Sequence, residues 1–192
     1  MIALNKIDIT PGSRIILPAD QLRTVYEHCR RKLAGRYFAD ESPEQKAFGL
    51  VAGRQSKQGF TVSRCFPLLK NARQIEPYKS FMDNIMTRYA VPSETPLARR
   101  GWVADPQELL ASVKECQREN LLLLGAYHMH RVAWQDDPRR DTPTVLDSIL
   151  AADSGMLIFI ISMINTDRPI IRAFYEGNPD MEIPIGEGDS TQ

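Results

Sequence analysis

The stretch LLLLGAYHMH, residues 121–130, carries the strongest fold signal in this chain. Leu121 to Tyr127 is a continuous apolar run, which is typical of a strand buried on both faces. Side chains alternate along a strand, so we expect His128 and His130 to point the same way and Met129 the opposite way. Two imidazoles at this spacing can bind one cation. Taken alone, the pattern also suits one packed and one solvated histidine.

A carboxylate downstream can complete a three-ligand set. A helix is expected to begin at Thr142 or Thr144, which places Asp147 near its start. Two histidines and an aspartate suit zinc and leave one position for water. The alternative for Thr144 and Asp147 is a simple capping arrangement, with the acid favoured by the helix dipole. Other acids that could replace Asp147 as ligand, or lie solvated in the preceding loop, are Asp136, Asp137 and Asp141.

Strands and helices are both expected outside this stretch. The patterns predict strands at 14–17, 48–52, 59–68, 156–163 and 170–175. They predict helices from Asp20 to about Gly35, at 81–89, and after an N-cap at Asp105. The mixture predicts an α/β fold with a mixed sheet flanked by helices. We expect one domain over residues 1–178, with an insertion at about 74–101, and a flexible C-terminal tail at 179–192.

Composition excludes several classes of partner. The 192 residues contain 24 Lys and Arg and 24 Asp and Glu, so no bulk charge favours nucleic acid or an anionic membrane. Cys29, Cys65 and Cys116 show no CxxC spacing, which indicates reduced, buried thiols. The longest apolar stretch, 156–164, is too short to span a bilayer, and the N-terminus lacks the pattern of a signal peptide. A cytoplasmic protein is expected.

The order of these segments resembles the JAB/MPN (JAMM) metalloprotease family, as a divergent bacterial-type member. The matching segments, spread over roughly 14–175, are Phe48–Gly53, Lys70–Ala72, Asp105–Leu110, the strand ending in His128-Met129-His130, and Pro143–Asp147. The resemblance implies an MPN/JAB-like (cytidine deaminase-like) fold with Zn²⁺ bound by His128, His130 and Asp147. It also places Thr144 where the family has a serine that hydrogen-bonds near the reacting carbonyl.

The chain departs from the family at the general base. The family's glutamate lies three residues before the glycine of its Gly-Leu strand, and counting back from Gly49 gives Lys46. Glu44 has the same strand parity but lies about 6–7 Å further along. A bulge or shifted register could bring Glu44 to the site, and Glu41 is a more remote candidate. The second histidine is followed by Arg131 where the family usually has proline.

The resemblance implies a zinc-dependent peptidase or isopeptidase in which metal-activated water attacks a peptide or amide bond. The implied substrate is a protein or peptide, with the bond near the C-terminus of a small ubiquitin-like or sulfur-carrier protein. Glu44 would be the base and Thr144 the oxyanion donor. The alternative is a non-catalytic MPN-like interaction module, which the lysine at position 46 motivates.

Overall fold

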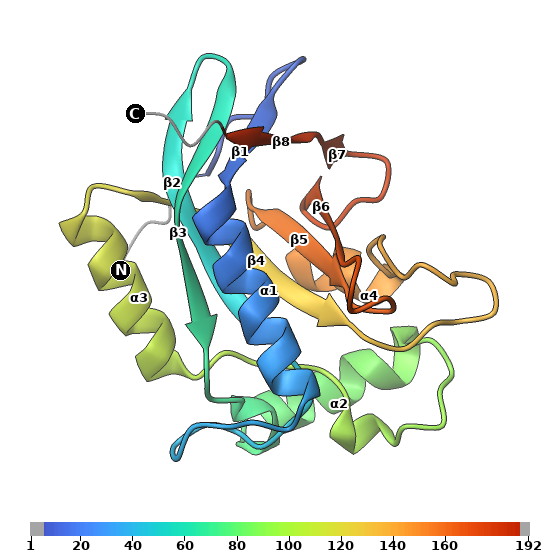
Figure 1. Cartoon of the computed structure of the whole chain (residues 1–192). Helices are drawn as coiled ribbons and strands as arrows, with labels where there is room; N and C mark the ends of the chain where they lie inside the picture. Colours follow the sequence, from blue (N-terminus) through green and yellow to red (C-terminus); the bar gives the residue numbers. More distant parts are fainter. Residues whose placement is uncertain (1–5, 189–192) are drawn as a thin grey trace.

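The chain folds into an α/β structure, seen in a computed structural model that describes residues 6–188 (Figure 1). The strands are β1 (Arg14–Pro18), β2 (Phe48–Ser56), β3 (Gly59–Leu68), β4 (Leu122–His130), β5 (Leu157–Ser162), β6 (Ile170–Tyr175), β7 (Glu182–Ile183) and β8 (Ile185–Gly188). The helices are α1 (Ala19–Leu33), α2 (Tyr78–Tyr89), α3 (Pro106–Arg118) and α4 (Val145–Ala151), with 3₁₀ turns η1 (Ala72–Gln74) and η2 (Leu97–Arg99). The predicted helices and strands are present.

All eight strands form one mixed sheet. Their order is β7-β6-β5-β4-β2-β3-β1-β8, with β4 parallel to β5 and antiparallel to β2. The two edge strands are consecutive in the chain, separated by Pro184 alone. The sheet therefore curls until its edges nearly meet, and β7 and β8 lie end to end in Figure 1. The predicted mixed sheet is confirmed, and its near closure was not foreseen.

Helices cover the two faces of this sheet. On one face, α1 contributes Val25 and Cys29 to the main core, which also contains Phe60, Tyr127 and Phe159. On the other face, α3 contributes Cys116 to a small cluster with Ala52 and Leu121. The three cysteines are buried and free, as predicted.

Strand β4 positions the residues of interest. Tyr127 and Met129 pack into the main core, so alternation sends His128 and His130 to the opposite face. The strand is fixed on both sides, with His128 opposite Phe48 of β2 and Ile160 of β5. The predicted orientation of the two histidines is confirmed.

The C-terminal segment differs from the expected flexible tail. Ile183 is buried, and Ile185 pairs with Ile15 of β1, so residues 182–188 complete the sheet. A Gly- and Pro-rich composition suggested a loose segment, but two apolar side chains and free strand edges determine its structure. Residues 1–5 and 189–192 of the expected domain and tail lie outside the described residues. Across residues 6–188, no helix has both the length and the apolar character needed to cross a membrane.

Candidate metal centre

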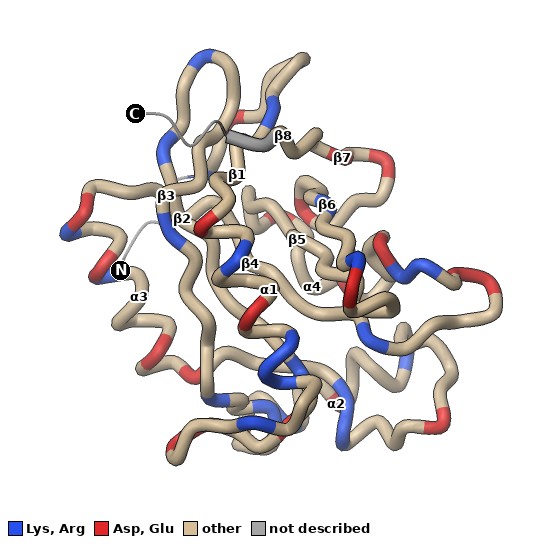
Figure 2. Tube along the Cα trace, viewed as in Figure 1, with Lys and Arg blue, Asp and Glu red and all other residues tan. Residues whose placement is uncertain are grey.

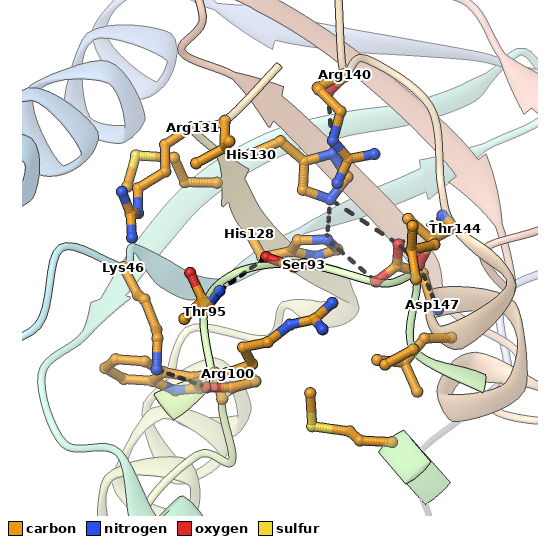
Figure 3. Close-up of a pocket in the computed structure, with 18 of the residues that line it drawn as sticks. Lys46, Ser93, Thr95, Arg100, His128, His130, Arg131, Arg140, Thr144 and Asp147 are labelled. Atoms are coloured by element: carbon orange, nitrogen blue, oxygen red, sulfur yellow. Dashed lines mark hydrogen bonds and ion pairs between the residues drawn. The ribbon is translucent and has the colours of Figure 1, made fainter. Parts of the chain in front are cut away.

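His128, His130 and Asp147 converge on one point, as Figure 3 shows. The Nε2 atoms of the two histidines lie 3.1 Å apart. Oδ1 of Asp147 lies 3.3 Å from Nε2 of His128, and Oδ2 lies 3.9 Å from Nε2 of His130. Over residues 6–188, these are the one set of three or more His, Cys, Asp or Glu side chains close enough to share a metal ion.

A backbone carbonyl sets the orientation and tautomer of His130. Nδ1 of His130 lies 2.9 Å from the carbonyl oxygen of Arg140. A carbonyl can only accept a hydrogen bond, so Nδ1 carries the proton and Nε2 presents a lone pair. Burial first, and then the neighbouring His128, lower the pKa of His130 to about 3, so the ring is neutral. This is the protonation state that a metal ligand requires.

The turn that supplies this carbonyl has an unusual backbone. Arg140 has a φ of 51°, in the left-handed region that few residues other than glycine adopt. Its guanidinium stacks 3.4 Å above the ring centroid of Trp134, and its backbone NH donates to Asp137. These contacts hold the turn in place beside His130. The sequence contained no signal for this interaction, because a backbone carbonyl has no residue signature.

Asp147 has a capping role and a free oxygen. Helix α4 begins after the N-cap Thr144, whose hydroxyl accepts from the Asp147 NH at 3.3 Å. Oδ2 of Asp147 in turn accepts from the Thr144 NH and hydroxyl at 2.6 and 2.8 Å. Among the described residues, Oδ1 makes no hydrogen bond except its contact with His128. The capping interpretation and the ligand interpretation are therefore compatible, because each uses a different oxygen.

The charge state of Asp147 also suits a ligand. Burial alone raises the pKa of this carboxyl group. The neighbouring His128 and His130 and the hydrogen bond from the Thr144 backbone NH together outweigh the effect of burial. The pKa of Asp147 therefore lies below its ordinary value. The group is a carboxylate at neutral pH.

The donor set fits a zinc ion. Two ligands about 2.0–2.1 Å from a tetrahedral zinc ion lie about 3.3 Å from each other. The observed separations, 3.1 Å between the two Nε2 atoms and 3.3 Å between Nε2 of His128 and Oδ1 of Asp147, are close to that value. Two imidazoles and one carboxylate form the three-ligand set of zinc sites that keep an open position.

The loop aspartates do not join this cluster. Asp137 accepts from the backbone and guanidinium of Arg140 at 2.8 and 3.2 Å. Asp141 is buried and pairs with Arg139 and Arg172. Asp136 is exposed. Of the four aspartates considered, Asp147 is the one that reaches the histidines.

A cavity of about 290 Å³ opens beside the three residues. It lies between the end of β4, the segment 90–102 and helix α4. Its basic lining residues are Lys46, Arg99, Arg100, Arg131 and Arg140, and its apolar ones include Met82, Met86, Val91, Val132, Leu146 and Leu150. Thr144 also lines it, and Asp147 is the one acidic residue among the described lining residues.

Glu44 and Glu41 are not brought to the cluster. The Glu44 carboxylate lies 2.7 Å from Nζ of Lys46 and accepts from the Asn71 amide at 3.0 Å. Lys46 lines the cavity, and it also donates to the carbonyl of Gly101 at 3.1 Å. The position where the resemblance places a base therefore holds a cation, and Glu44 lies behind it.

Glu41 has a structural environment instead. Its carboxylate is fully buried and binds Arg31, the buried Lys32 and the backbone NH of Phe38. Burial raises the pKa of Glu41, but these partners outweigh it and lower the pKa to about 2. Glu41 is a permanent carboxylate that organises the segment before β2.

Comparisons with known proteins bear on the fold. No protein-family model matches this sequence, and no curated protein is significantly similar to it. A solution structure of a protein from Desulfitobacterium hafniense is similar over 93% of this chain and 95% of that one, with a TM-score of 0.60 and 22% identity. A second, from Salinibacter ruber, covers 91% of this chain and 92% of that one, with a TM-score of 0.49 and 17% identity. At this identity, the first likeness shows that the α/β fold described above also occurs in a solved structure.

Proposed function

We propose that this chain is a zinc-dependent hydrolase of peptide or amide bonds, of the JAMM type, with an MPN/JAB-like fold. The convergence of His128, His130 and Asp147 at the wall of a cavity carries the proposal. The order of the segments that resemble the family supports it. The proposed substrate is a protein or peptide cleaved near the C-terminus of a small ubiquitin-like or sulfur-carrier protein.

The described residues have defined tasks in this proposal. A zinc ion, when bound, polarises a carbonyl and makes water nucleophilic near neutral pH. The Arg140 carbonyl keeps His130 neutral and oriented, and Thr144 orients Asp147 through its backbone NH. The Thr144 hydroxyl donates to Asp147, so it can serve a developing oxyanion only by leaving that carboxylate.

Glu44 is the candidate general base, and its present contacts hold it away from the metal centre. A base must reach its proton directly or through one water. Glu44 qualifies only if its carboxylate exchanges Lys46 and Asn71 for a position in the cavity. The ion pair between Glu44 and Lys46 is also the specific observation that favours the second candidate, a non-catalytic MPN-like interaction module.

Metal content tests the first step. Purified protein should contain stoichiometric zinc by elemental analysis, and His128→Ala and Asp147→Asn should remove it. The variant Asp136→Asn, in an exposed loop position outside the cluster, is the matched control and should retain zinc. Wild-type protein that binds no divalent metal would refute the proposal.

Hydrolysis separates the two candidates. The zinc-loaded protein is incubated with ubiquitin-like proteins extended at the C-terminus by peptide or isopeptide bonds, and products are identified by mass spectrometry. Cleavage that His128→Ala abolishes supports the hydrolase, and Glu44→Gln should then lower the rate by about 100-fold or more if Glu44 is the base. Exposed Glu27→Gln, on α1 and outside the cavity lining, is the control carboxylate. Zinc binding without cleavage would favour the interaction module.

A further inference from the structure

The cavity beside the metal centre has a strong local excess of positive charge. Within the part of the chain that the structure describes, five Lys and Arg side chains line it, and Asp147 is the one acidic residue. The whole chain carries equal numbers of acidic and basic residues, and Figure 2 shows both signs spread along it. The excess therefore belongs to this cavity and not to the protein as a whole. A bound divalent cation would increase it.

Three of the five cations form no ion pair with a described residue. Lys46 is paired with Glu44, and Arg140 with Asp137. Within residues 6–188, no carboxylate lies within ion-pair distance of the others, which are Arg99, Arg100 and Arg131. Arg99 and Arg131 are exposed, so water can solvate them, and alone they would be ordinary surface residues.

Arg100 differs because it is half-buried. Burial lowers the pKa of its guanidinium, which means that the charged form is incompletely solvated. A partly desolvated cation without a counter-charge is unfavourable unless a ligand supplies that charge. In Figure 3 its side chain extends toward His128 and Asp147. Arg140 lines the same cavity.

Arg140, which also lines this cavity, has one polar atom without a partner in the described part of the chain. Nε of Arg140 is buried and has no hydrogen-bond partner among the described residues, and Arg140 is 6% exposed. Buried donors in folded proteins are nearly always paired with protein, water or ligand. Arg140 lines the same cavity as Arg100. Arg100, whose guanidinium has no carboxylate partner among the described residues, thus provides donors suited to the oxygen atoms of an anion.

The lining also contains apolar side chains. Leu146 and Leu150 of α4, Val132, and Met82 and Met86 of α2 contribute to it. A ligand that suits this lining combines an anionic group with an apolar group. The segment that provides Arg99 and Arg100 lies in the insertion at 74–101, outside the segments that resemble the JAMM family.

We propose that this cavity binds an anionic oxygen group, carboxylate or phosphate, of an otherwise apolar substrate through Arg100, with Arg99 and Arg131 at its rim. The inference rests on the proposed function only in taking this anion to be part of the substrate. In this proposal the insertion at 74–101 determines specificity. Its arginines bind the anionic group of the substrate that lies next to the bond to be cleaved.

Binding tests this without catalysis. Protein freed of metal by chelation and dialysis is titrated with N-acetyl-leucine as the carboxylate and with N-acetyl-leucinamide as its neutral counterpart, by calorimetry or NMR. Phenyl phosphate provides the phosphate arm. The two anions should bind more tightly than the amide, and added salt should lower the affinity of both anions. The anion that binds more tightly identifies the substrate group as a carboxylate or a phosphate.

Variants assign the binding to the cavity. Arg100→Gln should weaken the preferred anion by about tenfold or more, the loss expected for a charge-assisted hydrogen bond. Arg88→Gln, an exposed arginine of α2 outside the cavity, should bind like wild type. Equal binding of acid and amide, or unchanged binding by Arg100→Gln, would overturn the inference. If zinc fails to bind while the anions still depend on Arg100, the metal hydrolase is rejected and the anion site stands.

Discussion

Asp147 and Thr144 allow the capping role to be separated from the metal-binding role. The two residues share a capping box, but Oδ1 of Asp147 is free of it. Asp147→Asn retains a carbonyl oxygen that can accept from the Thr144 NH, and it replaces the anionic metal ligand with a neutral amide. Thr144→Ala removes the hydroxyl and leaves the carboxylate. We therefore expect Thr144→Ala to lower stability while zinc binding is retained, and Asp147→Asn to lose zinc binding while metal-free stability is largely retained.

The magnitudes follow from these contacts. Loss of an N-cap hydroxyl costs about 1 kcal/mol of stability, with or without zinc. Zinc at 100 times its dissociation constant adds about 2.7 kcal/mol to the free energy of unfolding. Thr144→Ala should lower stability by the first amount and retain most of the zinc increment. Asp147→Asn should retain metal-free stability to within about 1 kcal/mol and lose most of the increment.

Urea unfolding followed by circular dichroism, in chelator and in buffered zinc, measures both quantities. Thr144→Ser is the matched control, because it retains the hydroxyl and should resemble wild type in both conditions. A full zinc increment in Asp147→Asn would refute the ligand role of Asp147. Loss of the increment in Thr144→Ala as well would show that the cap and the ligand cannot be separated.

Three further predictions concern the frame around the site. Glu41→Gln leaves Lys32 buried without its counter-charge and should lower the free energy of unfolding by urea by about 3 kcal/mol. The pKa of Glu41 in the folded protein, about 2, lies below the ordinary 4.5, so the stability advantage of the wild type should be complete above about pH 4.5 and disappear as the pH falls through 2. A variant as stable as the wild type would contradict this. Gly125→Ala places a Cβ 1.9 Å from the Leu157 carbonyl oxygen, so it should push β4 away from β5. Zinc affinity, measured by competition with a chelator, should fall. Zinc affinity equal to that of the wild type would show that the strand adapts. Asp105→Ala removes the acceptor for two NH groups of α3 and should cost about 1 kcal/mol without changing zinc affinity, and any loss of zinc would contradict the separation of α3 from the site.

The secondary structure could be predicted where local patterns and tertiary environment agree. The apolar run before His128 became the central strand β4, and Asp105 followed by Pro106 became the N-terminus of α3. The histidine pair could be oriented from strand alternation alone. Asp147 could be placed because a helix start is a local feature with recognisable capping residues.

The sequence could not indicate features that depend on distant parts of the chain. Closure of the sheet by β7 and β8 depends on free edges of β1 and β6, which are remote in sequence. The support of His130 comes from a backbone carbonyl in a left-handed turn. The cationic cavity brings together residues from the segment before β2, the insertion and the loop after β4. None of these juxtapositions has a local pattern.

The separation of Glu44 from the candidate metal centre has a physical cause in the segment before β2. Glu41 is buried between Arg31 and Lys32, and the Lys32 ammonium also donates to the Ser42 carbonyl. These contacts fix the chain just before Glu44, so a shift of register that would move Glu44 into the cavity must also disturb a buried ion pair. Breaking such a pair costs about 3–5 kcal/mol, which is more than one new hydrogen bond returns. Glu44 can therefore reach the metal centre only by a side-chain rotation that releases Lys46, and substrate that draws Lys46 toward its own negative charge would favour that rotation.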